Sequence, residues 1–460
     1  MSGYRERVTA AVADGWRVAG VHAADEGRTV RALLVGESGE TRLESSPVVG
    51  GECPSLVDLA PAIGWDEREA HDLYGVRFAG HEPLRPLVTH DLTLRHWTVG
   101  VRGHDSYQIA VGPIHAGVIE SGHFRFHVVG DRILHLDTRL FYKHRALERA
   151  AAGRTLDEGL AYAARACAAC AVASSVAYAQ ACEDALGLRA PDELRHVRTI
   201  LLELERAWNH LNDIAAVCAG VGFAAGNNHF AALTEEARRL NAGLAGHRFL
   251  FGTVAVGGSS LSLGVDAVRS ARETLERLRS GFNEGWRTLQ FDHSFQDRLP
   301  GVGTLSPGDA RSLGTVGPAA RAAGIGVDVR SVAKQLAYEG FAPAAQARPT
   351  GDVRARLEQR AVELEQTFGL LDSLLDGPLS AVAARNGAAT NRFGVGRVES
   401  PRGETHCVVE RAGSQLERLR LRTGSYANWP SVAHVAAGNL LPDFPLINKS
   451  FELCYACADR

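Results

Sequence analysis

Residues 452–460 read ELCYACADR and place a Cys-x-x-Cys pair, Cys454 and Cys457, at the end of the chain. Chain ends are usually poorly ordered, and reactive thiols on such a tail are a liability. A second pair, Cys167 and Cys170, lies in the stretch RACAAC at residues 165–170. Each pair can supply half of the ligands of one metal ion, so the two pairs together predict a buried four-thiolate site. Such a site would hold the last residues against the middle of the chain.

The spacing of the pairs leaves the identity of the metal open. Four thiolates most often bind structural zinc, but a zinc ribbon keeps its two pairs within roughly 15–20 residues, which Cys170 and Cys454 do not. On spacing alone, zinc and a catalytic transition metal are equally compatible, and a single pair could also be a redox pair. The other four cysteines stand alone and are expected to be small buried hydrophobic residues: Cys53, Cys182, Cys218 and Cys407.

Charge and hydropathy argue against nucleic-acid binding and against a membrane-spanning segment. The chain has 460 residues, with 50 basic and 53 acidic side chains, so it lacks the basic excess that neutralises nucleic-acid phosphates. It has no apolar run long enough to span a bilayer, and the polar N-terminal stretch MSGYRERVTAAVADGW lacks the apolar core of a signal peptide. We expect a cytoplasmic protein that reaches a membrane only through partner subunits.

The pattern along the chain predicts an α+β protein. Residues 1–95 have the pattern of a small α/β domain, with a strand at TVRALLVG (29–36) and a helix in GWDEREAHDLYGVRF (64–78) that ends near Gly75. Residues 96–460 form the second domain, which begins with strands that turn at Gly130 and continues as a mainly helical region with small sheets. Residues 391–425 are expected to be irregular and strand-like.

Helix-start signals support this middle region. Thr155 and Glu158 have the spacing of a capping box at the start of an alanine-rich segment. Pro191 is placed near the start of another helical segment.

Three motifs occur in the order found in the large subunits of nickel–iron hydrogenases: RxCxxC (165–170), PRGETH (401–406) and CxxCxxR (454–460). The chain most resembles the membrane-associated, energy-converting type, as in formate hydrogenlyase, in GPIHAGVIESGHFRF (112–126), LRTGSYANWPS (421–431) and LINKSFELCYACADR (446–460). The stretch WDEREAHDLYGVRFAGHEPLR (65–85) resembles the 30-kDa subunit of respiratory complex I. This second resemblance implies a docking domain at residues 1–95 whose charged residues 67–69 contact partner subunits.

The hydrogenase resemblance implies roles for individual residues. Cys167 and Cys454 would be terminal nickel ligands, and Cys170 and Cys457 would bridge nickel to an iron that carries carbon monoxide and cyanide. Soft thiolates suit nickel, and metal binding keeps them deprotonated. Cys454 is also the candidate proton acceptor.

Two further residues match family positions. Arg402 would hold its guanidinium over the metals, where a permanent cation stabilises negative charge. Glu120 would relay protons from Cys454.

Some positions depart from the family pattern. Ala168 and Ser174 stand where the family usually has Gly and His, and Glu452-Leu453 replaces the usual Asp-Pro. Ser174 lies one helical turn from Cys170, so it is expected to face the site with a hydroxyl in place of an imidazole. Arg460 stands where a protease removes the extension of many relatives, which fits either a mature form or nickel insertion without cleavage.

Three functions follow as hypotheses. The first is the catalytic large subunit of a multisubunit nickel–iron hydrogenase, which forms or oxidises H2. It would exchange electrons with iron–sulfur clusters on a small partner subunit, because this chain has no further cysteine-rich motif. The resemblance also implies ferredoxin-like and antiporter-like membrane subunits, attachment to the cytoplasmic face of the membrane, and maturation proteins that insert the metals.

The second hypothesis is a complex I-like subunit of an NADH:quinone oxidoreductase. His115 would then lie at the quinone headgroup, NAD would bind in a neighbouring module, and no nickel would be present. The third is a non-catalytic scaffold in which the four cysteines hold zinc or nothing.

Overall fold

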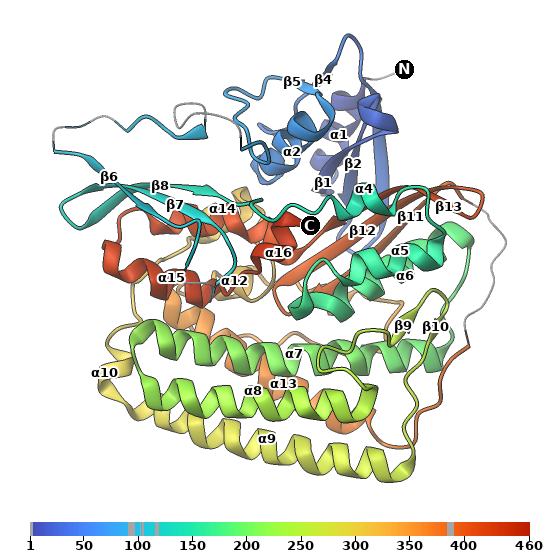
Figure 1. The fold of residues 1–460 in the computed structure, drawn as a ribbon, viewed down its shortest axis with the longest axis vertical. Coiled ribbons are helices and arrows are strands. Elements are labelled where there is room, and N and C mark those ends of the chain that lie inside the picture. The colour runs from blue at the N-terminus through green and yellow to red at the C-terminus, as the bar shows by residue number, and fades with distance from the viewer. Residues whose placement is uncertain (1–2, 91–96, 102, 104, 116–118, 384–390) are drawn as a thin grey trace.

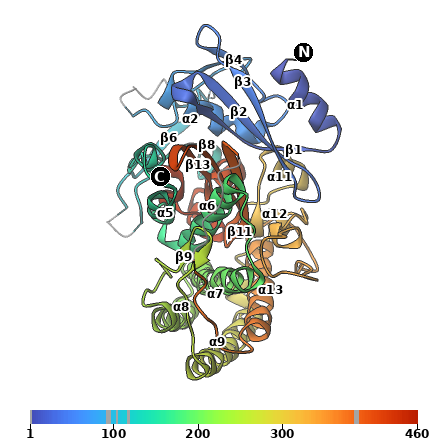
Figure 2. The ribbon, with the colours of Figure 1, turned by 90° about the vertical axis from the view of Figure 1, so that its right-hand side faces the viewer.

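The molecule has two parts that lie one above the other in two perpendicular views (Figures 1 and 2). It is described by a computed structural model that covers residues 3–90, 97–101, 103, 105–115, 119–383 and 391–460. We call the upper part, from α1 to β5 (residues 4–79), the N-terminal module, and the lower part, from β6 to α16 (residues 107–460), the main body. The expected domain boundary at residues 95 and 96 lies outside the described residues.

The N-terminal module is a small antiparallel sheet flanked by helices. Its sheet has the strand order β1-β2-β3, and a short parallel pair, β4 with β5, lies beside it. The predicted strand at residues 29–36 is confirmed as β2, and the predicted helix ends at Gly75, whose φ of 69° suits a residue without a side chain. The elements are α1 (Tyr4–Ala13), β1 (Arg17–Ala24), β2 (Thr29–Val35), β3 (Thr41–Pro47), β4 (Glu52–Pro54), α2 (Gly64–Tyr74) and β5 (Arg77–Ala79), with 3-10 turns at Asp25–Gly27 and Pro61–Ile63.

The expectation that residues 67–69 contact partner subunits is wrong for the two acidic side chains. Glu67 is buried inside the module, where its carboxylate accepts hydrogen bonds from the Ser55 hydroxyl and the Leu56 N–H. Glu69 is buried against the main body and pairs with Arg420. A carboxylate that leaves water needs such partners, and this chain supplies them itself.

The main body is built on four long helices, α7, α8, α9 and α13, that pack against one another at the bottom of Figure 1. The long helix α7 begins directly after Pro191, as the sequence predicted. The helices of the main body are α4 (Leu147–Ala151), α5 (Leu156–Ala164), α6 (Ala171–Leu186), α7 (Asp192–Val221), α8 (Ala224–Ala245), α9 (Val265–Phe291), α10 (His293–Gln296), α11 (Pro307–Ser312), α12 (Gly317–Ala322), α13 (Val353–Leu374), α14 (Gly424–Ala436), α15 (Phe444–Phe451) and α16 (Tyr455–Asp459).

Two three-stranded antiparallel sheets complete the main body. One has the order β6-β7-β8, with Gly130 in the turn between β7 and β8 as predicted, and the other has the order β11-β12-β13. Residues 391–425 are strand-like as expected but more regular than expected, because they form this second sheet and the start of α14. The strands are β6 (Tyr107–Val111), β7 (His123–Val129), β8 (Arg132–Arg139), β9 (Val254–Ala255), β10 (Gly258–Ser259), β11 (Phe393–Ser400), β12 (Gly403–Ala412) and β13 (Gln415–Arg422), with 3-10 turns at Ala168–Cys170, Val329–Ser331 and Leu441–Asp443.

The alanine-rich segment is broken where its cysteines lie. The capping box of Thr155 and Glu158 starts α5 as predicted, but the chain leaves the helix after Ala164, and α6 starts at Ala171. Among the described residues, no single helix is long and apolar enough to cross a membrane. The segments Leu156–Ala164 and Ala168–Leu186 meet that criterion only as a pair, bent by 119°.

Candidate metal centre

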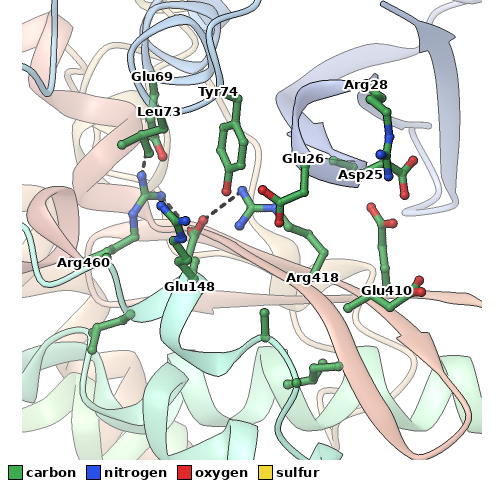
Figure 3. Close-up of a pocket in the computed structure, with 18 of the residues that line it drawn as sticks. Asp25, Glu26, Arg28, Glu69, Leu73, Tyr74, Glu148, Glu410, Arg418 and Arg460 are labelled. Carbon is green, nitrogen blue, oxygen red and sulfur yellow. Dashed lines mark hydrogen bonds and ion pairs between the residues drawn. The ribbon is translucent and has the colours of Figure 1, made fainter.

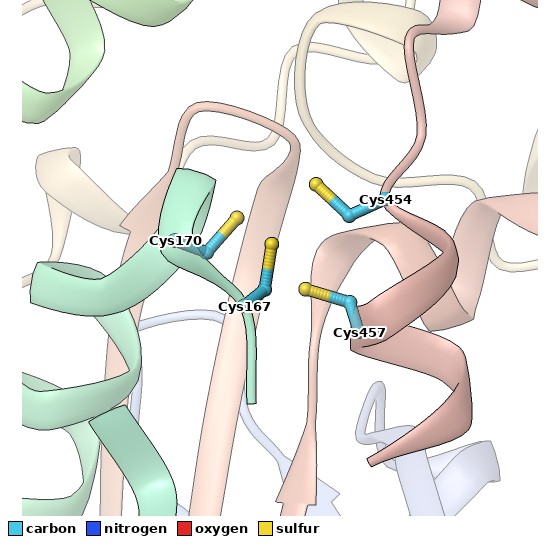
Figure 4. Close-up of side chains that lie close together, drawn as sticks. All are labelled: Cys167, Cys170, Cys454 and Cys457. Carbon is cyan, nitrogen blue, oxygen red and sulfur yellow. The ribbon is translucent and has the colours of Figure 1, made fainter. Parts of the chain in front are cut away.

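The four cysteines of the two pairs meet at one point between the middle of the chain and its end (Figure 4). Their sulfur atoms all lie within 4.8 Å of one another, and Cys167, Cys170 and Cys457 are buried while Cys454 is partly exposed. A tetrahedral metal with bonds of roughly 2.3 Å holds its sulfurs less than about 4.6 Å apart. One thiophilic metal ion can therefore reach all four sulfurs after small shifts.

The cluster is not stable as four thiolates on its own. Hydrogen bonds from the other three thiols, helped by the charge of Arg402, hold the pKa of Cys454 well below its usual value despite burial. Hydrogen bonds within the cluster, together with burial, raise the pKa of Cys170 and Cys457 instead. The protein alone disfavours thiolates at Cys170 and Cys457, so a cation is needed to hold these thiols deprotonated, as in metal sites.

Helix α7 fixes the first cysteine pair. The carboxylate of Glu205 accepts hydrogen bonds from the N–H groups of Val172 (2.6 Å) and Ala173 (3.0 Å), which are unpaired donors at the start of α6. One turn further along, the side-chain amide of Asn209 donates to the carbonyl of Ala169 (2.9 Å). Both contacts hold the turn that carries Cys170. Burial raises the pKa of Glu205 to about 8, although the two N–H groups act in the opposite direction.

Three other segments fix the second pair. The backbone N–H of Cys454 donates to the Ser425 hydroxyl at the start of α14 (3.1 Å). The N–H of Ala456, between the two cysteines, donates to the Glu120 carboxylate (2.7 Å). The carboxylate of Asp459 accepts from the N–H of Phe141 (2.7 Å). The predicted relay residue Glu120 is therefore in contact with the segment that carries Cys454 and Cys457.

Arg402 is buried beside the cluster and its orientation is fixed. Its Nε donates to the carbonyl of Glu452 (2.7 Å), and its two terminal nitrogens pair with the Asp213 carboxylate at 2.9 and 3.1 Å. This two-point pairing fixes the plane of the guanidinium. Burial alone would raise the pKa of Asp213, but Arg402, His210 and Arg360 more than offset it, so the pKa is lowered and the carboxylate stays charged.

Asp213 and Glu205 are the site residues that the sequence did not reveal. Both lie on α7, and their partners are far away in the sequence: Arg402 is 189 residues from Asp213. A weak signal was available, because both acids occur in the most apolar part of a helix, where charged residues need partners. Nothing in the sequence indicates which partners those are.

The other two residues considered from the sequence, Ser174 and His115, lie in different surroundings. Ser174 lies in the first turn of α6 and is fully buried, and its hydroxyl has no hydrogen-bond partner among the described residues. His115 is half-buried, and its Nε2 lies 2.7 Å from the carbonyl oxygen of Gly122, to which it donates.

Comparisons with known proteins agree with this architecture. The family model of the 49-kDa subunit of respiratory-chain NADH dehydrogenase matches residues 221–391 and 388–460, and that of the 30-kDa subunit matches residues 19–98. Subunit 5 of formate hydrogenlyase from Escherichia coli (strain K12) is 31% identical over 441 residues, which cover 89% of this chain and 77% of that protein. The chain belongs to this family of complex I 49-kDa-like hydrogenase large subunits. Its N-terminal module belongs to the matched 30-kDa type.

Two further similar proteins are a second hydrogenase and a chain of a respiratory membrane complex. The carbon monoxide-induced hydrogenase of Rhodospirillum rubrum is 29% identical, covering 77% of this chain and 99% of that protein. A solved structure of the membrane-bound sulfane sulfur reductase, an archaeal respiratory membrane complex, contains a similar chain. That chain is 25% identical with a TM-score of 0.70, and the match covers 77% of this chain and 99% of that one. Proteins similar to this chain therefore occur both as hydrogenases and in a respiratory complex that is named as a sulfane sulfur reductase.

Proposed function

We propose that this chain is the catalytic large subunit of a multisubunit nickel–iron hydrogenase. The observation that carries the proposal is the four-sulfur cluster built from Cys167, Cys170, Cys454 and Cys457. Arg402 beside it is oriented by two-point pairing with Asp213. A buried, oriented cation next to the thiolates suits a site where negative charge develops during a reaction.

The four cysteines would hold a nickel–iron group, with Cys167 and Cys454 as terminal ligands and Cys170 and Cys457 as bridging ligands. Soft sulfur donors suit these metals. When bound, that group supplies the redox chemistry of H2 formation and oxidation, with iron carrying carbon monoxide and cyanide. The chain supplies the pocket, the fixed charge and the route for protons.

Proton transfer would begin at the sulfur of Cys454, which is the partly exposed member of the cluster. Glu120 would receive the proton, a role supported by the hydrogen bond that its carboxylate accepts from the N–H of Ala456, between Cys454 and Cys457. Glu120 is exposed, so it can pass the proton to solvent or to a neighbouring subunit. Arg402 would balance the negative charge of the thiolates and their metal ligands.

Electrons would pass to a partner subunit. Among the residues that the structure describes, the other four cysteines do not come together in a second group that could hold a metal cluster. The relatives belong by name to formate hydrogenlyase and to a respiratory membrane complex, which supports a peripheral position on a membrane complex. An iron–sulfur small subunit, ferredoxin-like subunits, antiporter-like membrane subunits and a cytoplasmic location complete the proposal.

The complex I-like alternative depends on His115. It has some support in a 26% identical NADH-quinone oxidoreductase component from Phocaeicola vulgatus. However, Nε2 of His115 already donates to the Gly122 carbonyl, so only the other ring nitrogen is left for a quinone. This hypothesis also gives no reason for four sulfurs to meet.

Infrared spectroscopy and metal analysis of the complex purified from its own host test the proposal. We expect carbon monoxide and cyanide bands with about one nickel per chain, since four thiolates form a single site. Cys454→Ala should lose nickel and H2 turnover, whereas Cys218→Ala should keep both, because Cys218 is a buried core residue away from the cluster.

Other results would contradict the proposal. Zinc without the infrared bands would favour the scaffold hypothesis. Quinone reduction that is lost in His115→Ala but kept in Cys454→Ala would favour the complex I-like one.

A further inference from the structure

The N-terminal module holds Arg460, the residue that follows α16, through a buried ion pair (Figure 3). A terminal nitrogen of Arg460 donates to a Glu69 carboxylate oxygen at 2.5 Å, and the other donates to the Leu421 carbonyl at 2.5 Å. Glu148 is further away, at 3.4 Å, and the guanidinium lies 4.6 Å from the centre of the Tyr426 ring. Glu69 belongs to α2, so the N-terminal module contacts the last residue of the main body.

We propose that Glu69 is a positioning residue for the terminal cysteine pair. By holding Arg460, it keeps α16 in place and so directs the sulfurs of Cys454 and Cys457 toward Cys167 and Cys170. The proposal rests on the proposed role of the four thiols as metal ligands. It adds that the N-terminal module takes part in assembling the metal centre.

Helix α16 cannot hold this position by itself. It has five residues, and a helix of that length is not stable without tertiary contacts. Cys457 lies in its middle and Cys454 directly precedes it. Its far end is held by the Asp459 carboxylate, which accepts from backbone N–H groups of the main body, and by the Arg460 side chain. Arg460 therefore links the ligand-bearing helix to Glu69.

The charges around Arg460 give Glu69 a role that other residues cannot take over. Three buried carboxylates surround four guanidinium groups here, and two of those carboxylates come from α2. One oxygen of Glu69 serves Arg420 and the other serves Arg460. Without Glu69, positive charges would face one another away from water, which is strongly unfavourable. The residues are Asp66, Glu69 and Glu148 with Arg418, Arg420, Arg422 and Arg460.

The space on one side of Arg460 is not filled by packed side chains. A cavity of about 530 Å³ lies between the module and the main body and is lined by Glu69, Tyr74, Glu148, Arg418 and Arg460, among others. On that side, the Arg460 side chain is not fixed by tight packing, and it is held from the other side by the Glu69 ion pair, the Leu421 carbonyl and the Tyr426 ring. Neutralising Glu69 should therefore release α16 without disrupting a core.

Alkylation of individual cysteines tests the proposal on the full-length chain treated with a chelator. We expect Glu69→Gln to raise the alkylation rate of Cys457 at least tenfold, measured by mass spectrometry of the C-terminal peptide. Cys53 in the core of the module and Cys407 in the main body are buried and report whether each part stays folded. Glu67→Gln is the matched control, because Glu67 lies on the same helix, is equally buried and makes its contacts inside the module.

Two results would overturn the proposal. One is an unchanged Cys457 rate in Glu69→Gln with Cys53 and Cys407 protected. The other is equal acceleration in Glu67→Gln, which would indicate general loosening of the module. If Glu69→Gln exposes Cys53, then Arg460→Gln, which removes the other partner, must accelerate Cys457 with Cys53 protected. Absence of this acceleration also rejects the proposal.

Titration with Co²⁺, followed by thiolate charge-transfer absorption, adds a readout that needs no nickel–iron group. Glu69→Gln should weaken Co²⁺ binding at least tenfold, whereas Glu67→Gln should not. An unchanged Co²⁺ affinity in Glu69→Gln would contradict the proposal. Failure to find nickel in the native complex would reject the proposed function and leave this result standing.

Discussion

The role proposed for Arg402 depends on the geometry of its guanidinium group as well as on its charge. All three of its guanidinium nitrogens are engaged, one with the Glu452 carbonyl and two with the Asp213 carboxylate. A lysine carries the same charge but has a single nitrogen on a flexible stem, and it cannot reproduce a two-point pairing. The planar shape of the guanidinium therefore fixes where the positive charge lies beside the cluster.

We expect Arg402→Lys to lower H2 turnover by about 10²-fold while the metal content stays near that of the unchanged chain. The physical reason is loss of the oriented charge, with the four sulfur ligands intact. Turnover measured beside nickel and iron content checks this, and Arg354→Lys on an exposed part of α13 is the control. Full activity in Arg402→Lys would show that the orientation of the charge is unimportant.

The sequence alone identified the cysteine pairs, because thiols at this spacing indicate a metal site without knowledge of their neighbours in the fold. Two cysteine pairs far apart can be expected to meet, because each alone is an incomplete metal site, and the structure brings their sulfurs together. Asp213 and Glu205 are ordinary acids whose role comes from partners distant in the sequence. The expectation for Glu69 came from the resemblance to the 30-kDa subunit, and it was wrong because α2 turns Glu69 toward the main body of the same chain.

At the scale of elements, the packing of α6 against β11 fixes the first cysteine pair. Two glycines of β11 allow the close approach: a Cβ at Gly394 would lie 2.0 Å from the Ala181 carbonyl oxygen, and one at Gly396 would lie 1.9 Å from that of Ala177. Both distances are far below contact, and the atoms met are rigid backbone. Helix α6 begins at Ala171, so its position against the sheet also sets the position of Cys170.

Gly396→Ala should therefore destabilise the protein by about 1–3 kcal/mol or more, because the methyl group forces α6 away from the sheet. The matched substitution is Gly243→Ala on the exposed face of α8, where an added Cβ meets nothing within 4 Å. It should stabilise by up to about 1 kcal/mol, since alanine is the better helix former. Denaturant unfolding of both variants checks the opposite signs, and two changes of the same sign would contradict the packing argument.

The sequence predicted most elements but not the features that shape the site. Capping signals at Thr155 and before α7 are local and therefore readable. The break between α5 and α6 is not, because alanine and arginine favour helix and only the meeting of the cysteines explains it. The sheet of residues 393–422 was expected only as an irregular, strand-like segment, because its strands are stabilised by pairing with one another and by α6.

At the scale of the whole molecule, the two parts are joined by ion pairs whose carboxylates are buried. Asp66 and Glu69 of α2 meet arginines of β13, and Glu404 of β12 pairs with Arg17 of β1 at 2.5 Å. Burial would raise the pKa of Glu69 and Glu404, but their arginine partners more than offset it and lower both pKa values. The junction is therefore sensitive to acid.

The sign of this dependence follows from proton linkage. In the unfolded chain a glutamate titrates near pH 4.3, above its lowered pKa in the folded protein, so below about pH 4.3 the unfolded chain binds more protons. The stability from these pairs is fully present above that pH and is lost as the pH falls. Each such group can contribute up to about 1.4 kcal/mol per pH unit in that window.

We therefore expect the urea midpoint of the first unfolding transition to fall steeply below about pH 4.3, because the unfolded chain then takes up protons that the ion-paired carboxylates of the folded chain do not. Glu404→Gln should be less stable than the unchanged chain at neutral pH and should show a flatter dependence, since it removes one of the titrating groups. Glu273→Gln, on the exposed face of α9, should keep the slope of the unchanged chain. An equally steep slope in Glu404→Gln would mean that the acid sensitivity does not arise at Glu404.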